Sequence, residues 1–134
     1  MPVHKQLSVF LPNRPGILAN LSNVLAEANV NILAMSVHDT VDNAVIRLVL
    51  DNPMKALLLL EREEMYVTEQ DVVVLAVDNQ PGILARIAQK LSRADINIQY
   101  AYCTAALSQT SGCIVLKTEH PEQALECLRE FEFG

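Results

Sequence analysis

The sequence predicts an α+β protein made of two similar units, each running strand, helix, strand, strand, helix, strand. Two internal alignments are the first basis for this prediction. Residues 11–37 match residues 77–103 at an offset of 66, with ten identities in 27 positions. Residues 44–60 match residues 112–128 at an offset of 68, with six identities in 17 positions. The second basis is the hydrophobic pattern, which alternates between strand-like and helix-like spacing within each copy. Together these features predict a tandem duplication.

The first strand and helix follow from the residues near the N-terminus. In residues 5–11 apolar and polar side chains alternate, which is typical of a half-buried strand. Pro15 suits the first turn of the next helix, because a missing N–H loses no hydrogen bond there. Apolar residues then recur at helical spacing and predict one buried stripe, made of Ile17, Leu18, Leu21, Val24, Leu25 and Ala28. Asn29 and, in the second copy, Asp95 should end these helices, since both residues tolerate the left-handed conformation of a C-cap.

Two strands, a second helix and a last strand complete each unit. Residues 31–38 and 44–51 are expected to form strands around a turn. Asn52-Pro53 opens the second helix of the first copy, and His120-Pro121 opens that of the second copy. Residues 65–78 are strand-like throughout. This segment should therefore contain both the last strand of the first unit and the first strand of the second.

Antiparallel strands with two helices on one face make each unit a ferredoxin-like βαββαβ sandwich. We place the units at residues 1–69 and 70–134. A unit of this size buries only roughly 60% of its unfolded surface, so the two are expected to pack together. The second unit ends at Gly134, where its fourth strand should begin. The sequence leaves open whether that strand is short, missing or replaced by another chain.

The composition indicates a soluble, acidic, globular protein. Apolar residues make up 51% of the 134 residues, and the formal net charge is −6, which argues against disorder. Ten Lys and Arg residues are spread thinly along the chain, which argues against nucleic-acid binding. No apolar run is long enough for a membrane span, and the segment MPVHKQ does not resemble a signal peptide. Three cysteines, an odd number, suit a reducing compartment, so we expect a cytoplasmic protein.

The most specific signal is N-x-P-G-I-L-A, which occurs twice between a strand end and a helix start. The candidate ligand-binding residues are Asn13, Pro15, Gly16 and Ile17 in the first copy and Asn79, Pro81, Gly82 and Ile83 in the second. The first N–H groups of a helix have no partner and favour an anion, and a glycine leaves room for a ligand to approach them. The asparagine side chain offers both a donor and an acceptor. A zwitterionic amino acid needs this combination, although the same motif is also common turn chemistry.

A second pair of asparagines, Asn31 and Asn97, lies eighteen residues beyond the first pair, each followed by isoleucine. In the predicted topology each one opens the second strand of its unit, where its side chain points across an interface between units. The other interpretation is that these residues close the preceding helix, a role for which Asn29 and Asp95 are already available. The sequence favours neither interpretation.

Other groups of residues give weaker signals. The three histidines lack the spacing of a metal site, and no phosphate loop, nucleophile elbow or zinc-protease motif is present. We therefore expect no metal, no cofactor and no catalytic residues. Cys103 and Cys113 lie on the two arms of one predicted hairpin and are interpreted as small hydrophobic residues. The four leucines at 57–60 are interpreted as helix core.

The motif N-x-P-G after a strand, an amphipathic helix and then Asn-Ile opening the next strand resembles the ACT domain. The resemblance covers nearly the whole chain as two ACT modules. It implies a regulatory module that binds amino acids where the strand–helix loop of one module faces the second strand of another. In members that bind serine, the loop Asn and the Asn after the helix hold the ligand. The matching residues here are Asn13 with Asn31 and Asn79 with Asn97.

This resemblance implies a non-catalytic sensor of a small amino acid or related metabolite, acting allosterically as a homodimer or through an enzyme partner. The second module is more polar around its loop and is the better candidate for an occupied site, because Gln80 replaces Arg14 and Asp78 replaces Pro12. The alternative function is a structural protein-interaction module that modulates an enzyme partner without binding a small ligand. The third possible function is that of an enzyme in its own right, because ferredoxin-like units also host catalysis.

Overall fold

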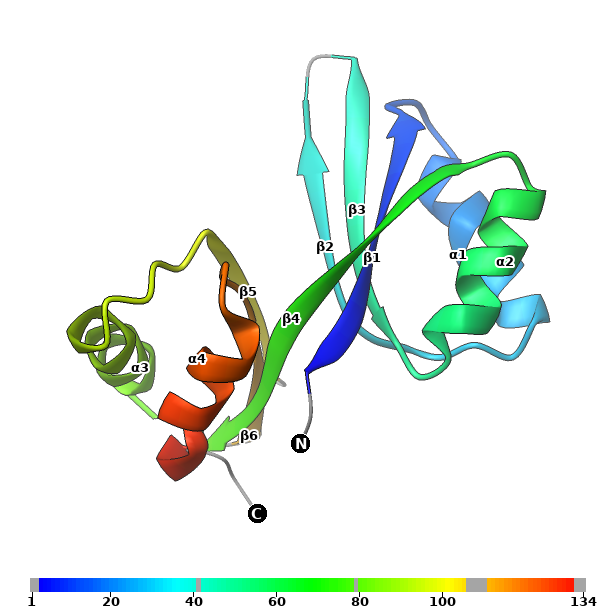
Figure 1. Ribbon diagram of the computed structural model, residues 1–134. Helices are drawn as coiled ribbons and strands as arrows, with labels where there is room; N and C mark the ends of the chain where they lie inside the picture. Colours follow the sequence, from blue (N-terminus) through cyan, green and yellow to red (C-terminus); the bar gives the residue numbers. More distant parts are fainter. Residues whose placement is uncertain (1–2, 41, 79, 106–110, 132–134) are drawn as a thin grey trace. The chain divides into compact units, whose positions relative to one another are not determined.

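A computed structural model describes residues 3–40, 42–78, 80–105 and 111–131 of the chain (Figure 1). Its internal contacts divide the chain into two compact units. The N-terminal unit is Lys5–Gln70, and the C-terminal unit combines Asp71–Gly134 with Met1–His4. Of the described residues, Val3 and His4 thus group with the C-terminal unit, whereas our proposed boundary assigns them to the first module.

The N-terminal unit has the predicted order of elements. These are β1 (His4–Pro12), α1 (Ile17–Glu27), β2 (Ile32–Asp39), β3 (Asn43–Leu50), α2 (Pro53–Arg62) and the first part of β4 (Tyr66–Asp78). The strand order is β2-β3-β1-β4, and β3 runs antiparallel to both β1 and β2. Both helices cover one face of this sheet (Figure 1). The ferredoxin-like fold predicted for this copy is confirmed.

The C-terminal unit repeats this plan with the rest of β4 as its first strand. It continues with α3 (Ile83–Arg93), β5 (Tyr100–Ala105), β6 (Ser111–Lys117), α4 (Pro121–Cys127) and a short 3₁₀ helix, η1 (Arg129–Phe131). The central strand β6 pairs antiparallel with both β4 and β5. A single strand, β4, therefore serves both units, as the strand-like segment at residues 65–78 predicted.

The start of the chain contributes to the core of the C-terminal unit. No strand follows α4 within the residues that the structure describes. The neighbour of β4 in the sheet order is β1, and Val3, just before β1, packs against the core of the C-terminal unit. Val3 thus joins the core of the C-terminal unit, which the sequence did not indicate.

Each unit has its own hydrophobic core, and the two cores use aligned positions. The first contains Leu21, Leu25 and Leu60, and the second contains their counterparts Ile87, Leu91 and Leu128. The helical stripe predicted between residues 17 and 28 supplies the first core, except that Leu18 is exposed. The duplication therefore preserved the buried positions.

The ends of the first helices confirm the predicted C-cap residues. Asn29 and Asp95 have φ angles of 59° and 58°, in the left-handed region. In the first copy the Val30 N–H donates to the carbonyl of Leu25 over 3.0 Å. In the second copy the Ile96 N–H donates to the carbonyl of Leu91 over 2.9 Å. These bonds form Schellman motifs, which satisfy the last carbonyls of each helix.

Two local predictions were wrong. Of the four leucines at 57–60, only Leu60 is fully buried, and Leu58 is 63% exposed on the surface of α2. Four leucines in a row cannot all face one side of a helix, because its period is 3.6 residues. The strand expected to open at Asn97 begins at Tyr100 instead, although its match in the first copy, β2, begins right after Asn31.

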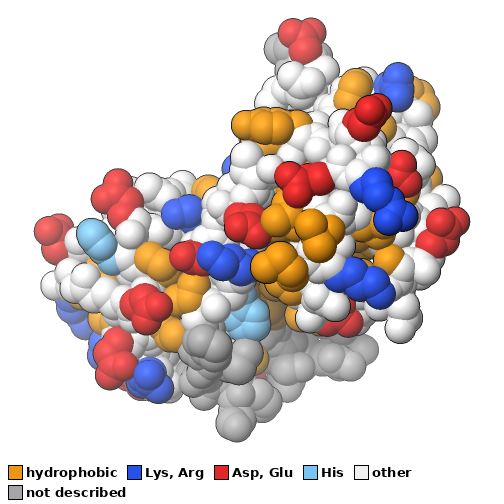
Figure 2. Space-filling view, turned by 45° about the vertical axis from the view of Figure 1, so that its right-hand side comes forward, with side chains coloured by type: hydrophobic (Ala, Val, Ile, Leu, Met, Phe, Trp, Pro, Cys, Tyr) orange, Lys and Arg blue, Asp and Glu red, His pale blue; other side chains and the backbone are white. Residues whose placement is uncertain are grey.

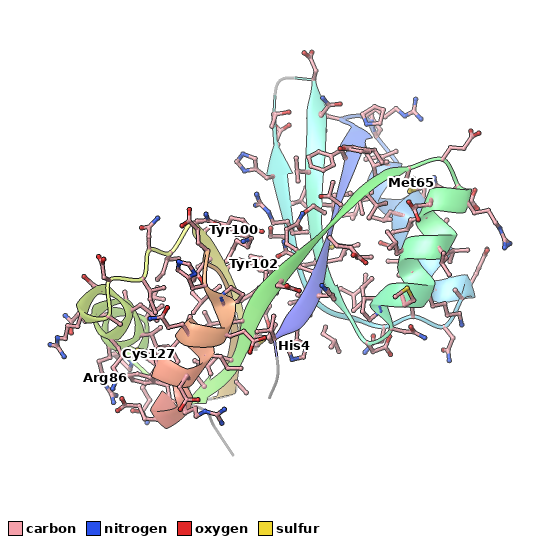
Figure 3. All side chains as sticks on the ribbon, in the orientation of Figure 1. His4, Met65, Arg86, Tyr100, Tyr102 and Cys127 are labelled. Atoms are coloured by element: carbon pink, nitrogen blue, oxygen red, sulfur yellow. The ribbon has the colours of Figure 1, made fainter. Side chains whose placement is uncertain are left out.

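Contacts between α3 and the end of the chain hold α3 in place within the C-terminal unit. Lys90 forms an ion pair with Glu130, which raises the pKa of the Lys90 ammonium and lowers the pKa of the Glu130 carboxyl. The Arg86 guanidinium lies 5.3 Å from the centre of the Phe131 ring, a cation–π distance. Arg86 is labelled in Figure 3 beside Cys127 of α4. These contacts fix the helix whose N-terminus belongs to the candidate site.

His4, labelled at the start of β1 in Figure 3, should make the stability of the protein depend on pH. Burial lowers the pKa of His4 below its usual value of 6.5, and its Nε2 atom has no hydrogen-bond partner among the described residues. Below pH 6.5 the unfolded chain therefore takes up a proton that the folded chain resists. We expect the free energy of unfolding to fall as the pH drops below 6.5 and to be level above it.

This expectation is checked by guanidinium unfolding of the wild type and of His4→Gln between pH 5 and 8. The variant lacks the titrating group, so its stability should change less over the acidic part of this range. Parallel profiles for the two proteins would show that His4 does not contribute.

Candidate functional site

The N-x-P-G motif forms the same tight turn in both copies. The Ile17 N–H donates to the Arg14 carbonyl over 3.4 Å, and in the second copy the Ile83 N–H donates to the Gln80 carbonyl over 3.1 Å. Gly16 has φ 86° and ψ −7° at the third position of this turn, which is the geometry of type II. Its counterpart Gly82 has φ 87° and ψ −4°. The turn interpretation of the motif is thus correct, and it explains why each motif carries Pro-Gly.

The helices begin at Ile17 and Ile83, so each glycine is an N-cap and Pro15 lies in the turn rather than in the first helical turn that we predicted. Among the described residues no side chain caps either helix. The second helix of the N-terminal unit differs, because its Lys55 N–H donates to the Asn52 side chain over 3.2 Å. The starts of α1 and α3 therefore keep amide donors for another acceptor.

Open space lies over both glycines. A Cβ atom added to Gly16 or Gly82 would meet no atom within 4 Å. Within the described part of the chain, the N–H groups of Leu84 and Ala85 in the first turn of α3 have no acceptor. The start of α3 therefore combines amide donors that lack a described acceptor with open space at Gly82.

The loop asparagine of the first copy is already engaged by its own unit. The Asn13 side chain donates a hydrogen bond to the Asp39 carboxylate at the end of β2. The aligned position in the second copy is Ala105, which has no carboxylate. Asn79 itself lies outside the described residues. The two copies of the motif are consequently not equivalent.

In the N-terminal unit the second asparagine, Asn31, lies far from the first, Asn13. Pro12, next to Asn13, pairs with Asn43 at one end of β3, whereas Ile32, next to Asn31, pairs with Leu50 at the other. The seven residue steps of β3 span about 23 Å. A small ligand therefore cannot touch both asparagines of this unit, and bringing them together requires a loop and a strand from different modules.

The backbone of Asn31 is anchored, and its side chain is exposed. Its N–H donates to the Asp51 carboxylate over 2.9 Å, and its carbonyl accepts from the Asp51 N–H over 3.1 Å. Asn97 is also exposed and lines a cavity of about 340 Å³ at the C-terminal end of α3, together with Ser92 and Asp95. Both asparagines thus present their side chains to solvent, Asn31 just before β2 and Asn97 three residues before β5.

A cavity of about 400 Å³ lies at the start of α3. Its lining combines the turn and first helical turn with the ends of three strands, including Gly82, Ile83, Val77, Cys103, Thr104 and Ile114. The structure thus brings Gly82 and Ile83 together with residues of the β5–β6 hairpin. Sequence reasoning assigned no binding role to the hairpin residues, because they carry no motif of their own.

The cysteines of this hairpin are free. Cys103 lies on β5 and Cys113 on β6, on the two arms of the hairpin as predicted. Burial raises the pKa of the Cys113 thiol, which keeps it protonated at neutral pH. A protonated thiol is a weak nucleophile, so Cys113 acts in the cavity wall as a small apolar group.

In the described ranges no three His, Cys, Asp or Glu side chains gather closely enough to hold a metal ion. None of the helices in that part of the chain has the length and apolar character that crossing a membrane requires.

The chain belongs to the family described as an ACT domain pair, whose model matches residues 1–133. The resemblance seen in the sequence is thereby confirmed. Among solved structures, protein BT0572 from Bacteroides thetaiotaomicron is 32% identical with a TM-score of 0.87, over 96% of this chain and 88% of that one. No curated protein matches this chain.

Two further structures share the fold at lower identity. The ligand-free regulatory subunit of aspartate kinase from Thermus thermophilus is 20% identical with a TM-score of 0.70, and the alignment covers 97% of both chains. The corresponding subunit from Thermus flavus is 22% identical with a TM-score of 0.65, over 96% of this chain and 92% of that one. At these identities the likeness establishes a common fold.

Proposed function

We propose that this protein is a non-catalytic regulatory protein that binds a small amino acid or related metabolite between ACT modules. The observation that carries the proposal is the cavity of about 400 Å³ at the uncapped start of α3. The free N–H groups of Leu84 and Ala85 suit a carboxylate, because the helix dipole adds to their attraction for an anion. The side chain of Asn79 is proposed to accept from the ammonium group of the ligand.

The second module is the proposed site of binding. Its loop has an uncharged Gln80 where the first loop has Arg14, and no carboxylate stands where Asp39 engages Asn13. In the first module the ligand would have to displace Asp39 from Asn13. In the second module the aligned Ala105 offers no such competitor.

The proposed regulatory mechanism is differential binding between two arrangements of modules. Because Asn31 lies at the far end of its unit from Asn13, a ligand at that loop meets such an asparagine only from another module, and we propose the same for the second module. A homodimer provides that module, as the ACT resemblance implies. The ligand favours the arrangement in which it makes both contacts, typically with ~1–3 kcal/mol of coupling. An enzyme partner would read out this change, and the free cysteines suit the cytoplasmic location that we propose.

The test is calorimetric titration with the twenty amino acids, on the wild type and on two matched variants. Asn79→Ala should weaken binding at least tenfold, because it removes the acceptor for the ammonium group. Asn13→Ala should leave the affinity unchanged, since that side chain is held by Asp39. Absence of binding by all twenty amino acids would contradict the proposal.

The alternative function, a protein-interaction module, is supported by the surface of α2. Met54 and Leu58 are each 63% exposed there, and Lys55 and Arg62 lie beside them. Figure 2 shows hydrophobic side chains gathered among charged ones on the N-terminal unit. The aligned positions on α4 carry Glu122 and Glu126 instead of the two apolar residues. The α2 surface therefore differs from its own duplicate in a way that favours a protein contact.

Leu58→Glu is expected to lower the association constant of this protein, with itself or with its partner, at least tenfold. The variant should remain folded. The second copy already tolerates glutamate at this position, as Glu126, so the helix should accept the change. Sedimentation velocity measures the association, and calorimetry tests whether amino-acid binding is retained. An unchanged association constant would contradict a role of the α2 surface.

A further inference from the structure

We infer that the cavity at the start of α3 selects amino acids with a neutral aliphatic side chain. This inference rests on the proposed function and concerns the class of ligand at the same site. It follows from the chemistry of the cavity wall rather than from the free amides of the helix, which recognise only the carboxylate that all amino acids share.

Among the described residues the wall of the cavity is predominantly apolar, and the neighbouring Asp78 carboxylate accepts a hydrogen bond from the Gln80 side chain over 2.6 Å. Its side chains include Val77, Ile83, Leu84 and Ile114, and its polar side chains are Gln80 and Thr104. None of the described residues that line the cavity is Asp, Glu, Lys, Arg or His. A charged ligand side chain would lose its water here without gaining a partner, which is costly. The wall therefore disfavours acidic and basic amino acids.

The floor of the cavity is continuous with the core of the C-terminal unit. Val77 and Ile114 are buried members of that core, and Ile83 packs against it. An aliphatic side chain that enters the cavity would thus extend the existing hydrophobic core. Each methylene buried there contributes roughly the same free energy as in a protein interior.

The volume agrees with a single amino acid. About 400 Å³ lies near the lower end of the roughly 300–1,000 Å³ typical of small-molecule sites. A mostly apolar wall with a few converging polar groups is also the usual composition of such sites.

The first copy shows that this neutral lining is specific to the second module. At the positions aligned with Gln80 and Thr104 it carries Arg14 and His38, and the next residue is Asp39. Arg14 would thus place a positive charge where the second module has the neutral Gln80. The inference therefore applies to the second module alone.

The decisive measurement is calorimetric titration of the full chain with alanine, 2-aminobutyrate and norvaline, an unbranched series that lengthens by one methylene at a time. The affinity should rise roughly fourfold with each methylene, the equivalent of about 0.8 kcal/mol. Aspartate and lysine should bind at least tenfold more weakly than norvaline. Affinities that stay level along the series, or a preference for aspartate or lysine, would overturn the inference.

Three variants locate the effect in this cavity. Cys103 is exposed and lines the cavity, so Cys103→Phe fills it without disturbing the core, and Val37→Phe is the matched change in the first copy. We expect Cys103→Phe to lower the norvaline affinity at least tenfold and the alanine affinity by less. Val37→Phe should change neither affinity. Thr104→Asp adds a carboxylate to the wall and should shift the preference from norvaline towards lysine. Equal effects of the two phenylalanine variants would place the ligand elsewhere and overturn the inference.

The outcomes separate this inference from the function on which it rests. If serine, aspartate or another polar amino acid binds best, the inference is wrong while the proposed amino-acid sensor stands. If no amino acid binds the wild type at all, both the proposed function and this inference are wrong.

Discussion

Replacing Leu60 with alanine is expected to lower the free energy of unfolding by about 2–5 kcal/mol. Leu60 is fully buried in the core of the N-terminal unit, where it packs with residues of both helices and the sheet. The loss combines the transfer free energy of the removed methyl groups with the cavity they leave. A unit of this size is stable by only roughly 3–10 kcal/mol, so the variant should lose a large share of its stability.

Guanidinium unfolding followed by circular dichroism measures this effect, and Leu58→Ala provides the matched control. Leu58 lies two residues earlier in the same helix but is 63% exposed, so its replacement should change the stability by less than about 0.5 kcal/mol. Similar losses for the two variants would contradict the packing described for α2.

Replacing Gly82 with valine is expected to cost about 2 kcal/mol or more of stability and to abolish ligand binding. The φ angle of 87° lies where an ordinary L-residue pays roughly 1–2 kcal/mol, and a β-branched residue pays more. Because a Cβ atom would meet nothing within 4 Å, the cost arises from the backbone rather than from a clash. The valine side chain would then occupy the open space beside the free N–H groups of α3, which explains the expected loss of binding.

Gly82→Asn separates the loss of stability from the loss of ligand binding. Asparagine tolerates a left-handed conformation, as Asn29 already does at φ 59°, so this variant should retain most of the stability. Thermal unfolding and calorimetric titration of both variants give the two readouts. A valine variant that is as stable as the asparagine variant would contradict the turn geometry.

Much of the fold could be predicted from the sequence because it depends on local signals that occur twice. The helix stripe containing Leu21 and Leu25, the caps at Asn29 and Asp95, and the continuous strand that became β4 all follow from periodicity and short-range backbone preferences. The N-x-P-G turn belongs to the same group, since Pro and Gly fix its φ angles directly.

The errors have a common physical origin in contacts between distant segments. Which of the leucines at 57–60 face the core depends on how α2 is rotated against the sheet, and a run of identical residues carries no information about that rotation. The late start of β5 at Tyr100 depends likewise on its pairing with β6 rather than on the Asn-Ile signal. Both copies carry the Asn-Ile motif, so the motif could not reveal that strand pairing begins only at Tyr100 in the second copy.

The sequence alone determined that this chain is a duplicated βαββαβ protein, because each copy repeats the same hydrophobic pattern and the same turn, and its resemblance to the ACT domain is borne out by the family match. Only the tertiary structure decided how the two copies differ. It engages Asn13 with Asp39, joins the first residues of the chain to the C-terminal unit, and closes an apolar cavity at the start of α3. Each of these features brings together residues far apart in the chain, and such proximity is set by packing rather than by local backbone preference.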